Sequence, residues 1–139
     1  MESPLHRVLI VDSNRLVADT LSLIFQRSGF KTHTTYSVEQ ALASIWNFHP
    51  DLLVCGVSIP DHEESLGAGH DGISLVHAIT QEFPSCRILV LTDCYASLHG
   101  IRECMDRFAP PVGVLAKPCP PTDLLREASA MLALSRVHV

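Results

Sequence analysis

Short runs of Val, Leu and Ile recur along this chain, and each is followed by a segment whose apolar residues have helical spacing. Three of the runs, Arg7–Asp12, Leu52–Val57 and Arg87–Thr92, are apolar almost throughout, as is typical of strands buried on both faces of a parallel sheet. Two further runs are Lys31–Thr35 and Val112–Ala116. Strands that alternate with helices predict parallel βα units joined by right-handed crossovers.

The segments between these runs have the period of amphipathic helices, and their ends carry capping signals. Ser37 is an expected N-cap with Gln40 three residues later, Gly29 follows the first helical segment, and Pro120-Pro121 opens the last one. The expected apolar stripes are Val17, Leu21, Ile24 and Phe25; Val38, Ala41, Leu42, Ile45 and Trp46; Ile73, Val76, Thr80 and Phe83; Leu98, Ile101, Met105 and Phe108; and Leu124, Leu125, Ala128, Met131 and Leu132. We therefore expect a (βα)5 doubly wound parallel sheet.

Length and charge exclude several classes of protein. A chain of 139 residues with 47% hydrophobic residues predicts a single ordered domain over residues 1–139, with a core over about residues 6–133 and a short C-terminal tail. The net charge is −5, from 10 Lys and Arg against 15 Asp and Glu. Because the sequence also lacks a run of basic residues, we expect no direct contact with nucleic acid. Without a long apolar run or a signal-peptide pattern, we expect a cytoplasmic protein that does not enter membranes.

The cysteines and histidines do not form a recognisable metal or redox motif. Five cysteines, with no C-x-x-C among them, favour reduced and mostly buried thiols. A redox pair of Cys94 and Cys119, which follow adjacent strand ends, is the alternative. None of the eight histidines has a partner at the spacing of a helical zinc motif.

The carboxyl ends of four predicted strands carry short segments that include polar residues. These segments are Asp12-Ser13, Gly56-Val57-Ser58, Thr92-Asp93 and Lys117-Pro118. In open parallel sheets this edge is where ligands bind. The pattern thus predicts a crevice there, without specifying its chemistry.

Four segments in this order resemble the receiver domain of bacterial two-component response regulators. They are Val8–Asp12, Pro50–Val54, Ile88–Thr92 and Leu115–Pro118. The resemblance extends from about Arg7 to Leu132. It implies a flavodoxin-like sheet with strand order 2-1-3-4-5. It also implies transfer of a phosphoryl group from a histidine kinase to an aspartate at the end of the third strand, beside Mg²⁺.

The resemblance assigns roles to three residues of this chain. Asp12 matches an acidic residue that binds Mg²⁺ directly or contacts the groups that bind it. Thr92 matches the hydroxyl that donates to a phosphoryl oxygen, and Lys117 matches the lysine that neutralises the phosphoryl charge.

Other positions depart from the family's pattern. The acceptor position falls on Gly56, and Ser13 stands where a second acidic residue is expected. The aromatic switch position is Val114, and Asp93 replaces a small residue. The segment Asp61–Asp71 is longer than the usual loop after the third strand. Its acidic and histidine side chains are capable of binding a metal, but Gly67 and Gly69 within it favour a flexible, solvated loop.

The resemblance with these departures favours a degenerate receiver that binds proteins without aspartyl phosphorylation. Its expected partners are a histidine kinase, an output domain or another receiver, with a homodimer through the fourth helix, fifth strand and fifth helix. The expected interaction residues are Leu98, Ile101, Met105 and Val114. We expect no cofactor and at most weak Mg²⁺ binding at Asp12, because Gly56 supplies no carboxylate and Lys117 is then able to pair directly with Asp12 or Asp93.

Two alternatives remain open from the sequence. One is a receiver that is still phosphorylated, on the off-register carboxylate of Asp61 or Asp93. The other is a flavodoxin-like domain that binds a small ligand close to Gly56, although Ser13-Asn14-Arg15 lacks a phosphate-binding cradle. No P-loop, G-x-G-x-x-G or catalytic triad motif is present, so we expect no enzymatic activity.

Overall fold

The computed structural model describes residues 6–57, 72–92, 112–116 and 119–137 of the chain. The strands are β1 (Arg7–Val11), β2 (Lys31–Thr35), β3 (Leu52–Val57), β4 (Arg87–Thr92) and β5 (Gly113–Ala116). The helices are α1 (Arg15–Arg27), α2 (Val38–Phe48), α3 (Gly72–Glu82) and α5 (Pro121–Val137). The expected helix with Leu98, Ile101 and Met105 lies outside the described residues.

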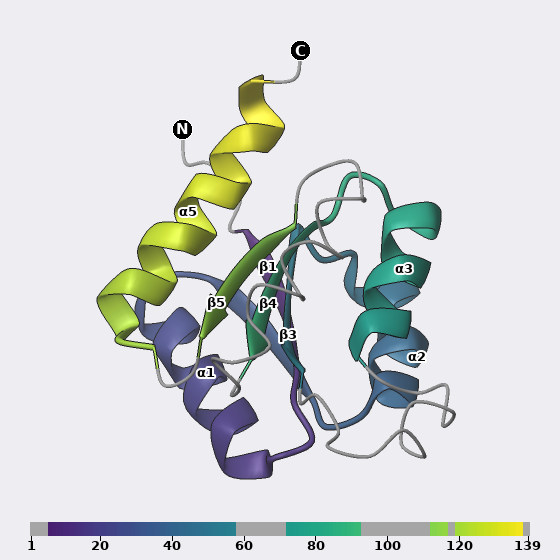
Figure 1. Cartoon of the computed structure of the whole chain (residues 1–139), viewed down its shortest axis with the longest axis horizontal. Coiled ribbons are helices and arrows are strands. Elements are labelled where there is room, and N and C mark those ends of the chain that lie inside the picture. Colours follow the sequence, from purple (N-terminus) through teal and green to yellow (C-terminus); the bar gives the residue numbers. More distant parts are fainter. Residues whose placement is uncertain (1–5, 58–71, 93–111, 117–118, 138–139) are drawn as a thin grey trace.

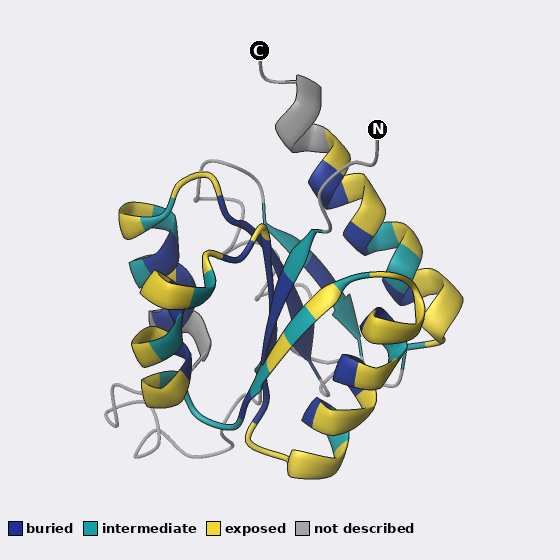
Figure 2. Ribbon diagram, turned by 180° about the vertical axis from the view of Figure 1, so that it is seen from behind, coloured by how far each residue is buried: buried dark blue, intermediate teal, exposed yellow. Residues whose placement is uncertain are grey.

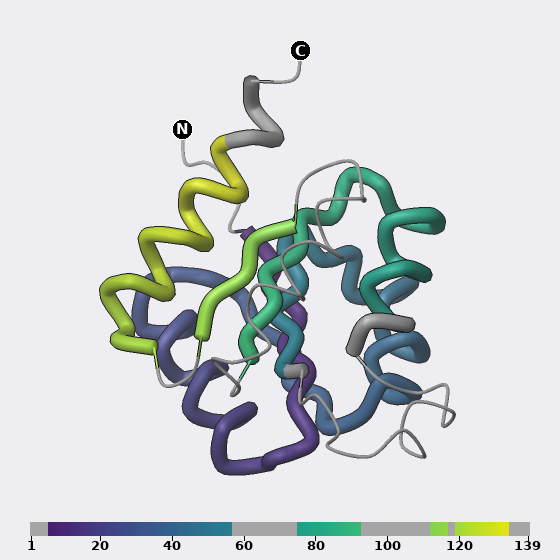
Figure 3. The backbone as a smooth tube through the Cα atoms, in the orientation of Figure 1, coloured from purple at the N-terminus to yellow at the C-terminus, as the bar shows by residue number. Residues whose placement is uncertain are grey.

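The five strands form one parallel sheet in the order β2-β1-β3-β4-β5, which confirms the predicted strand order. The sheet is the middle of three layers (Figure 1), with α1 and α5 on one face and α2 and α3 on the other. Figure 3 shows the same path as a continuous tube, with β1 in the interior of the fold. All strands therefore end at the same edge of the sheet.

The sheet has a buried cluster on each face, because side chains of a strand point alternately to its two sides. In β1, Val8 and Ile10 pack toward α1 and α5, whereas Leu9 and Val11 pack toward α2 and α3. Strand β4 is buried at every position, and Figure 2 shows buried residues along the inner strands with exposed ones on the outer sides of the helices. The continuous apolar runs in the sequence arise from this two-sided burial.

Local capping signals account for the helix ends. The Ser37 side chain accepts a hydrogen bond from the backbone N–H of Gln40, so Ser37 is the N-cap of α2. Gly29, with φ +93°, follows α1 and donates its N–H to the carbonyl oxygen of Gln26. That left-handed conformation suits glycine, which has no Cβ to clash.

Some details differ from the sequence-based expectations. Trp46 and Leu42, expected in the buried stripe of α2, are 61% and 39% exposed, because α2 buries only the narrow line through Ala41 and Ile45. Val114, expected on an interaction face, is 8% exposed and packs in the cluster beside α2 and α3. The direction of its side chain explains this burial, because Val114 and its strand partner Val90 both belong to the cluster on the side of α2 and α3.

Candidate functional site

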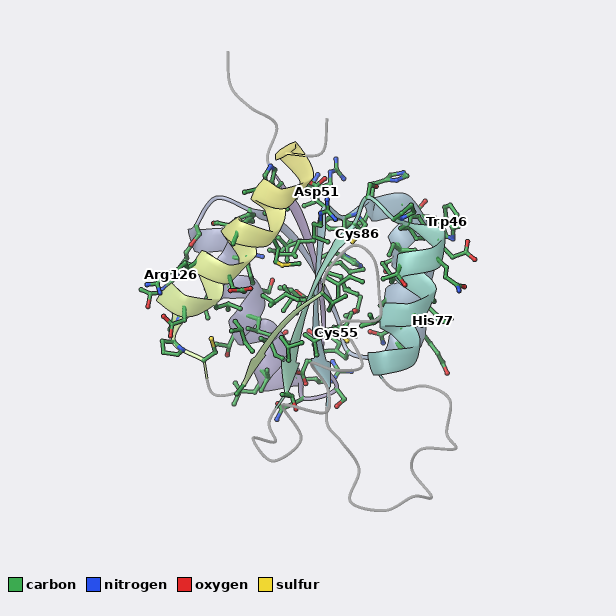
Figure 4. The ribbon with its side chains drawn as sticks, turned by 45° about the horizontal axis from the view of Figure 1, so that its top comes forward. Trp46, Asp51, Cys55, His77, Cys86 and Arg126 are labelled. Carbon is green, nitrogen blue, oxygen red and sulfur yellow. The ribbon has the colours of Figure 1, made fainter. Side chains whose placement is uncertain are left out.

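The strand register brings three of the predicted site residues to one edge of the sheet. Val11 in β1 is paired with Cys55 in β3. The residues that follow them, Asp12 just after β1 and Gly56 within β3, therefore lie side by side. Thr92 ends β4 opposite Val57. Figure 4 shows Cys55 toward this edge, with Asp51 and Cys86 toward the opposite one.

Asp12 is held at this edge by backbone hydrogen bonds. The residue is 4% exposed, and its Oδ1 accepts from the backbone N–H of Asn14 at 2.9 Å. Asn14 in turn caps α1, since its Oδ1 accepts from the backbone N–H of Val17. The backbone N–H of Asp12 donates to the carbonyl oxygen of Thr35 at 3.3 Å. The carboxylate therefore sits at the junction of β1, β2 and α1.

Gly56 lies at the centre of the edge and contributes only backbone. It is paired with Leu91 in β4. Because side chains alternate along a strand, position 56 has the same facing as Leu52 and Val54, which pack toward α1 and α5. Asp12 has the facing of Val8 and Ile10 on the same side. A side chain at position 56 would therefore emerge on the side of the sheet that carries Asp12.

Thr92 completes the described part of the edge. It is fully buried, and it is paired with Ala116, the last residue of β5. In sequence Lys117 follows Ala116 directly, but Lys117 and Asp93 lie outside the described residues, as do Asp61 and Cys94. Ser13 is exposed and carries a hydroxyl where the family's pattern has a carboxylate.

A divalent cation finds few ligands in the described part of this edge. Mg²⁺ binding depends on carboxylate oxygens, and Asp12 is the carboxylate that the described strand ends supply. Across residues 6–57, 72–92, 112–116 and 119–137, no group of three or more His, Cys, Asp or Glu side chains is placed to hold a metal ion. Among the described residues, Asp12 is therefore the candidate ligand for Mg²⁺ at this edge.

An aromatic and charged group beside Asp12 was not anticipated from the sequence. The Arg15 guanidinium lies over the ring of Tyr36, with Cζ 4.3 Å from the ring centroid. The Tyr36 hydroxyl donates to Asp19 Oδ1 at 2.6 Å. This hydrogen bond raises the pKa of Tyr36, and Arg15 opposes the shift. Only the spacing of Arg15 and Asp19 along one helix face offered a signal, because Tyr36 comes from another element.

No disulfide bond joins the described cysteines to one another. Cys55 and Cys86 are buried, and Cys119 is partly exposed. Burial raises the pKa of Cys86 to about 12, and the pKa of Cys119 is also raised, by burial and then by Asp123 and Glu127. Low-pKa thiols are the reactive ones, so these two are poor nucleophiles at neutral pH.

Comparison with known proteins establishes the family. The model of the response regulator receiver domain matches residues 8–129, and the chain belongs to this family. None of the described helices is long and apolar enough to cross a membrane.

The matches to individual proteins agree with this assignment. The chain is 23% identical over 134 residues to the DNA-binding response regulator MtrA of Mycobacterium tuberculosis, which is 95% of this chain and 53% of MtrA. It is 27% identical over 97 residues to sporulation initiation phosphotransferase F of Bacillus subtilis, which is 70% of this chain and 71% of that protein. The chain thus spans about half the length of MtrA and most of the smaller relative.

A solved structure shares the fold over the whole chain. It is the CheY-like receiver domain of Methanospirillum hungatei, with a TM-score of 0.80 and 24% identity. The match covers 98% of this chain and 100% of that one. The family and the fold therefore place this chain in two-component signalling.

Proposed function

We propose that this chain is a degenerate receiver, which transmits a signal through protein–protein contacts without aspartyl phosphorylation. The observation that carries the proposal is Gly56. It occupies the end of β3, where the receiver pattern has its acceptor aspartate, and it has no side chain to phosphorylate.

The surroundings of Gly56 support the same reading. Asp12 is buried and its Oδ1 is already used by the backbone of Asn14, and Ser13 adds no charge. With one described carboxylate at this edge, Mg²⁺ binding is expected to be weak, and Lys117 is expected to pair with an acidic residue directly. A domain of this kind has no turnover of its own and serves as a binding module.

Its expected partners follow from the family. Receivers interact with histidine kinases and with output domains, and a second receiver is a further candidate, including a homodimer through the fourth helix, β5 and α5. MtrA is named as a DNA-binding response regulator, so an output domain in the full-length protein is one way in which this chain would act. Buried cysteines that form no disulfide with one another support a reducing compartment, the cytoplasm.

The test compares the wild-type chain with Gly56→Asp under identical conditions. Both are incubated with acetyl phosphate and Mg²⁺, and the intact mass is recorded. We expect no mass change in the wild type. We expect a gain of one phosphoryl group in Gly56→Asp, because its new carboxylate emerges beside Asp12. Mg²⁺ calorimetry should likewise show binding that strengthens at least tenfold in the variant, as a second carboxylate joins Asp12.

A stoichiometric phosphoryl gain in the wild type would overturn the proposal. In that event, Asp61→Asn and Asp93→Asn identify the off-register acceptor, since the gain disappears in one of them. Millimolar or tighter Mg²⁺ binding by the wild type would contradict the weak metal site.

A further inference from the structure

A groove at the opposite edge of the sheet collects basic side chains. It is lined by Arg7, Lys31, His33, Ala43, Ser44, Asn47 and Phe48 and has a volume of about 390 Å³; we call it the basic groove. It lies between the start of β1 and β2 and the second half of α2. This places it at the amino ends of the strands, away from Asp12 and Gly56.

The internal contacts of the basic groove engage Arg7 and His33, and a carboxylate lies beside Arg7, since Asp51 Oδ2 accepts from the backbone N–H of Arg7 at 2.8 Å. Arg7 Nη1 donates to the carbonyl oxygen of Phe48 at 3.0 Å, which satisfies the C-terminal end of α2. His33 Nε2 lies 3.0 Å from Ser44 Oγ, and its ring packs on Phe48 with centroids 5.5 Å apart. These bonds fix two walls of the groove.

Lys31 differs from Arg7 and His33, because no described side chain of the groove forms an ion pair with its ammonium group. It is exposed, and the structure gives it no ion pair with a described carboxylate. On a chain of net charge −5, a groove with both Arg7 and Lys31 is the opposite of the average surface. Its charge fits an acidic occupant.

The same groove runs along an unpaired edge of the sheet. Among the strands that the structure describes, β2 is the first in the sheet order and pairs with β1 alone. The backbone N–H of Lys31 donates to His6, and the carbonyl oxygen of Thr35 accepts from Asp12. The backbone hydrogen-bonding groups of Lys31 and Thr35 therefore face β1. Because inward and outward bonds alternate along a parallel strand, the backbone N–H and C=O of Thr32 and Thr34 point away from β1.

We propose that β2 and the basic groove bind an extended acidic peptide from a partner protein, which adds to the sheet as a further strand. Its backbone pairs with Thr32 and Thr34. Its alternate side chains point to the side of α2, where carboxylates meet Lys31 and Arg7. The proposal does not depend on whether the chain is phosphorylated at another carboxylate.

The unpaired backbone favours a peptide over a free anion. A phosphate ion in the basic groove would bind Lys31 but would leave the backbone groups of Thr32 and Thr34 without a new partner. An added strand would bind Lys31 and would also pair with the backbone of Thr32 and Thr34. Alternation of side chains also sets a sequence requirement, since only residues two apart reach the groove together.

The experiment uses the full chain and two labelled peptides of identical composition. In the first peptide Glu alternates with Thr, and in the second the Glu residues are consecutive. Fluorescence anisotropy should show that the alternating peptide binds at least threefold more tightly, and that its affinity falls as salt is added. Amide hydrogen exchange should slow at Thr32 and Thr34 when this peptide is bound, and inorganic phosphate should not slow it.

Two variants separate the contributions of charge and backbone. Lys31→Gln should weaken binding of the alternating peptide about fivefold. Thr34→Pro removes an N–H that does not face β1, so the sheet should persist while binding falls at least tenfold. Arg126→Gln, on the exposed face of α5, is the matched charge control and should bind as the wild type does.

The proposal is overturned if the alternating peptide shows no binding at millimolar concentration, or if the two peptides bind equally. It is also overturned if Lys31→Gln and Arg126→Gln have the same effect, or if phosphate alone reproduces the exchange protection.

Discussion

Burial gives the Cys86 thiol, one residue before β4, a pKa of about 12, against an ordinary value of 9.0, with a further contribution from Asp51. The folded state therefore favours the neutral thiol. Above pH 9 the unfolded chain releases this proton more readily than the folded chain, so folding loses stability as the pH rises from about 9 to about 12.

We predict that the free energy of unfolding, from urea titrations between pH 8 and pH 11, falls as the pH rises through this range. Cys86→Ala should be less stable at pH 8 but should show a flatter pH profile. Cys119→Ala is the control, because Cys119 is partly exposed, and it should keep most of the slope. An unchanged slope in Cys86→Ala would show that other groups cause it.

Neighbouring residues of α2 show how burial determines the effect of a substitution. Ile45 is 1% exposed, whereas Trp46 is 61% exposed and meets the Phe83 ring edge-on, with centroids 4.5 Å apart. We predict that Ile45→Ala costs about 2–5 kcal/mol of unfolding free energy. Trp46→Ala should cost about 1 kcal/mol, the value of an aromatic pair. Chemical denaturation of both variants measures the difference, and equal losses would contradict the exposure of Trp46.

The cap of α2 is another local feature with a measurable effect. Ser37→Ala removes the acceptor for the N–H of Gln40 and should cost about 1 kcal/mol. Ser129→Ala, at an exposed position within α5, is the matched control. It should be neutral or slightly stabilising, because alanine is the better helix former. Urea titrations of the two variants test this, and the prediction fails if they have equal stability.

Features that depend on short stretches of chain were predictable from the sequence. The cap at Ser37, the glycine after α1 and the five strands were all predicted, because each depends on neighbouring residues. The orientation of Trp46 was not, because the position of α3 relative to α2 is not encoded in the sequence of α2. The same reason explains why Tyr36 and Arg15 were missed.

The candidate site was predictable to a different extent. That Asp12, Gly56 and Thr92 reach one edge follows from parallel strands, and the register confirms it. The basic groove was not predicted, since Lys31 and His33 lie on one strand and Ser44 and Phe48 on a helix. Only the packing of α2 on β1 and β2 brings them together.

In the molecule as a whole, the two buried clusters share the same strands. Leu9 belongs to one cluster and the adjacent Ile10 to the other, so neither face of the sheet is built independently of the other. We predict that Leu9→Ala and Ile10→Ala each cost about 2–5 kcal/mol and that each variant still unfolds in one transition. Calorimetry and circular dichroism should give coincident curves for both variants. A variant that loses one helix pair before the other would contradict this coupling.

The backbone at the end of β3 affects how readily mutation can restore or remove an acceptor aspartate at position 56. Gly56 is already paired in the sheet and already level with Asp12, so the position needs only a carboxylate to match the receiver pattern. A change of one base converts a suitable glycine codon into an aspartate codon. The binding module proposed for this chain and a phosphate-accepting switch therefore differ by one base change at this position.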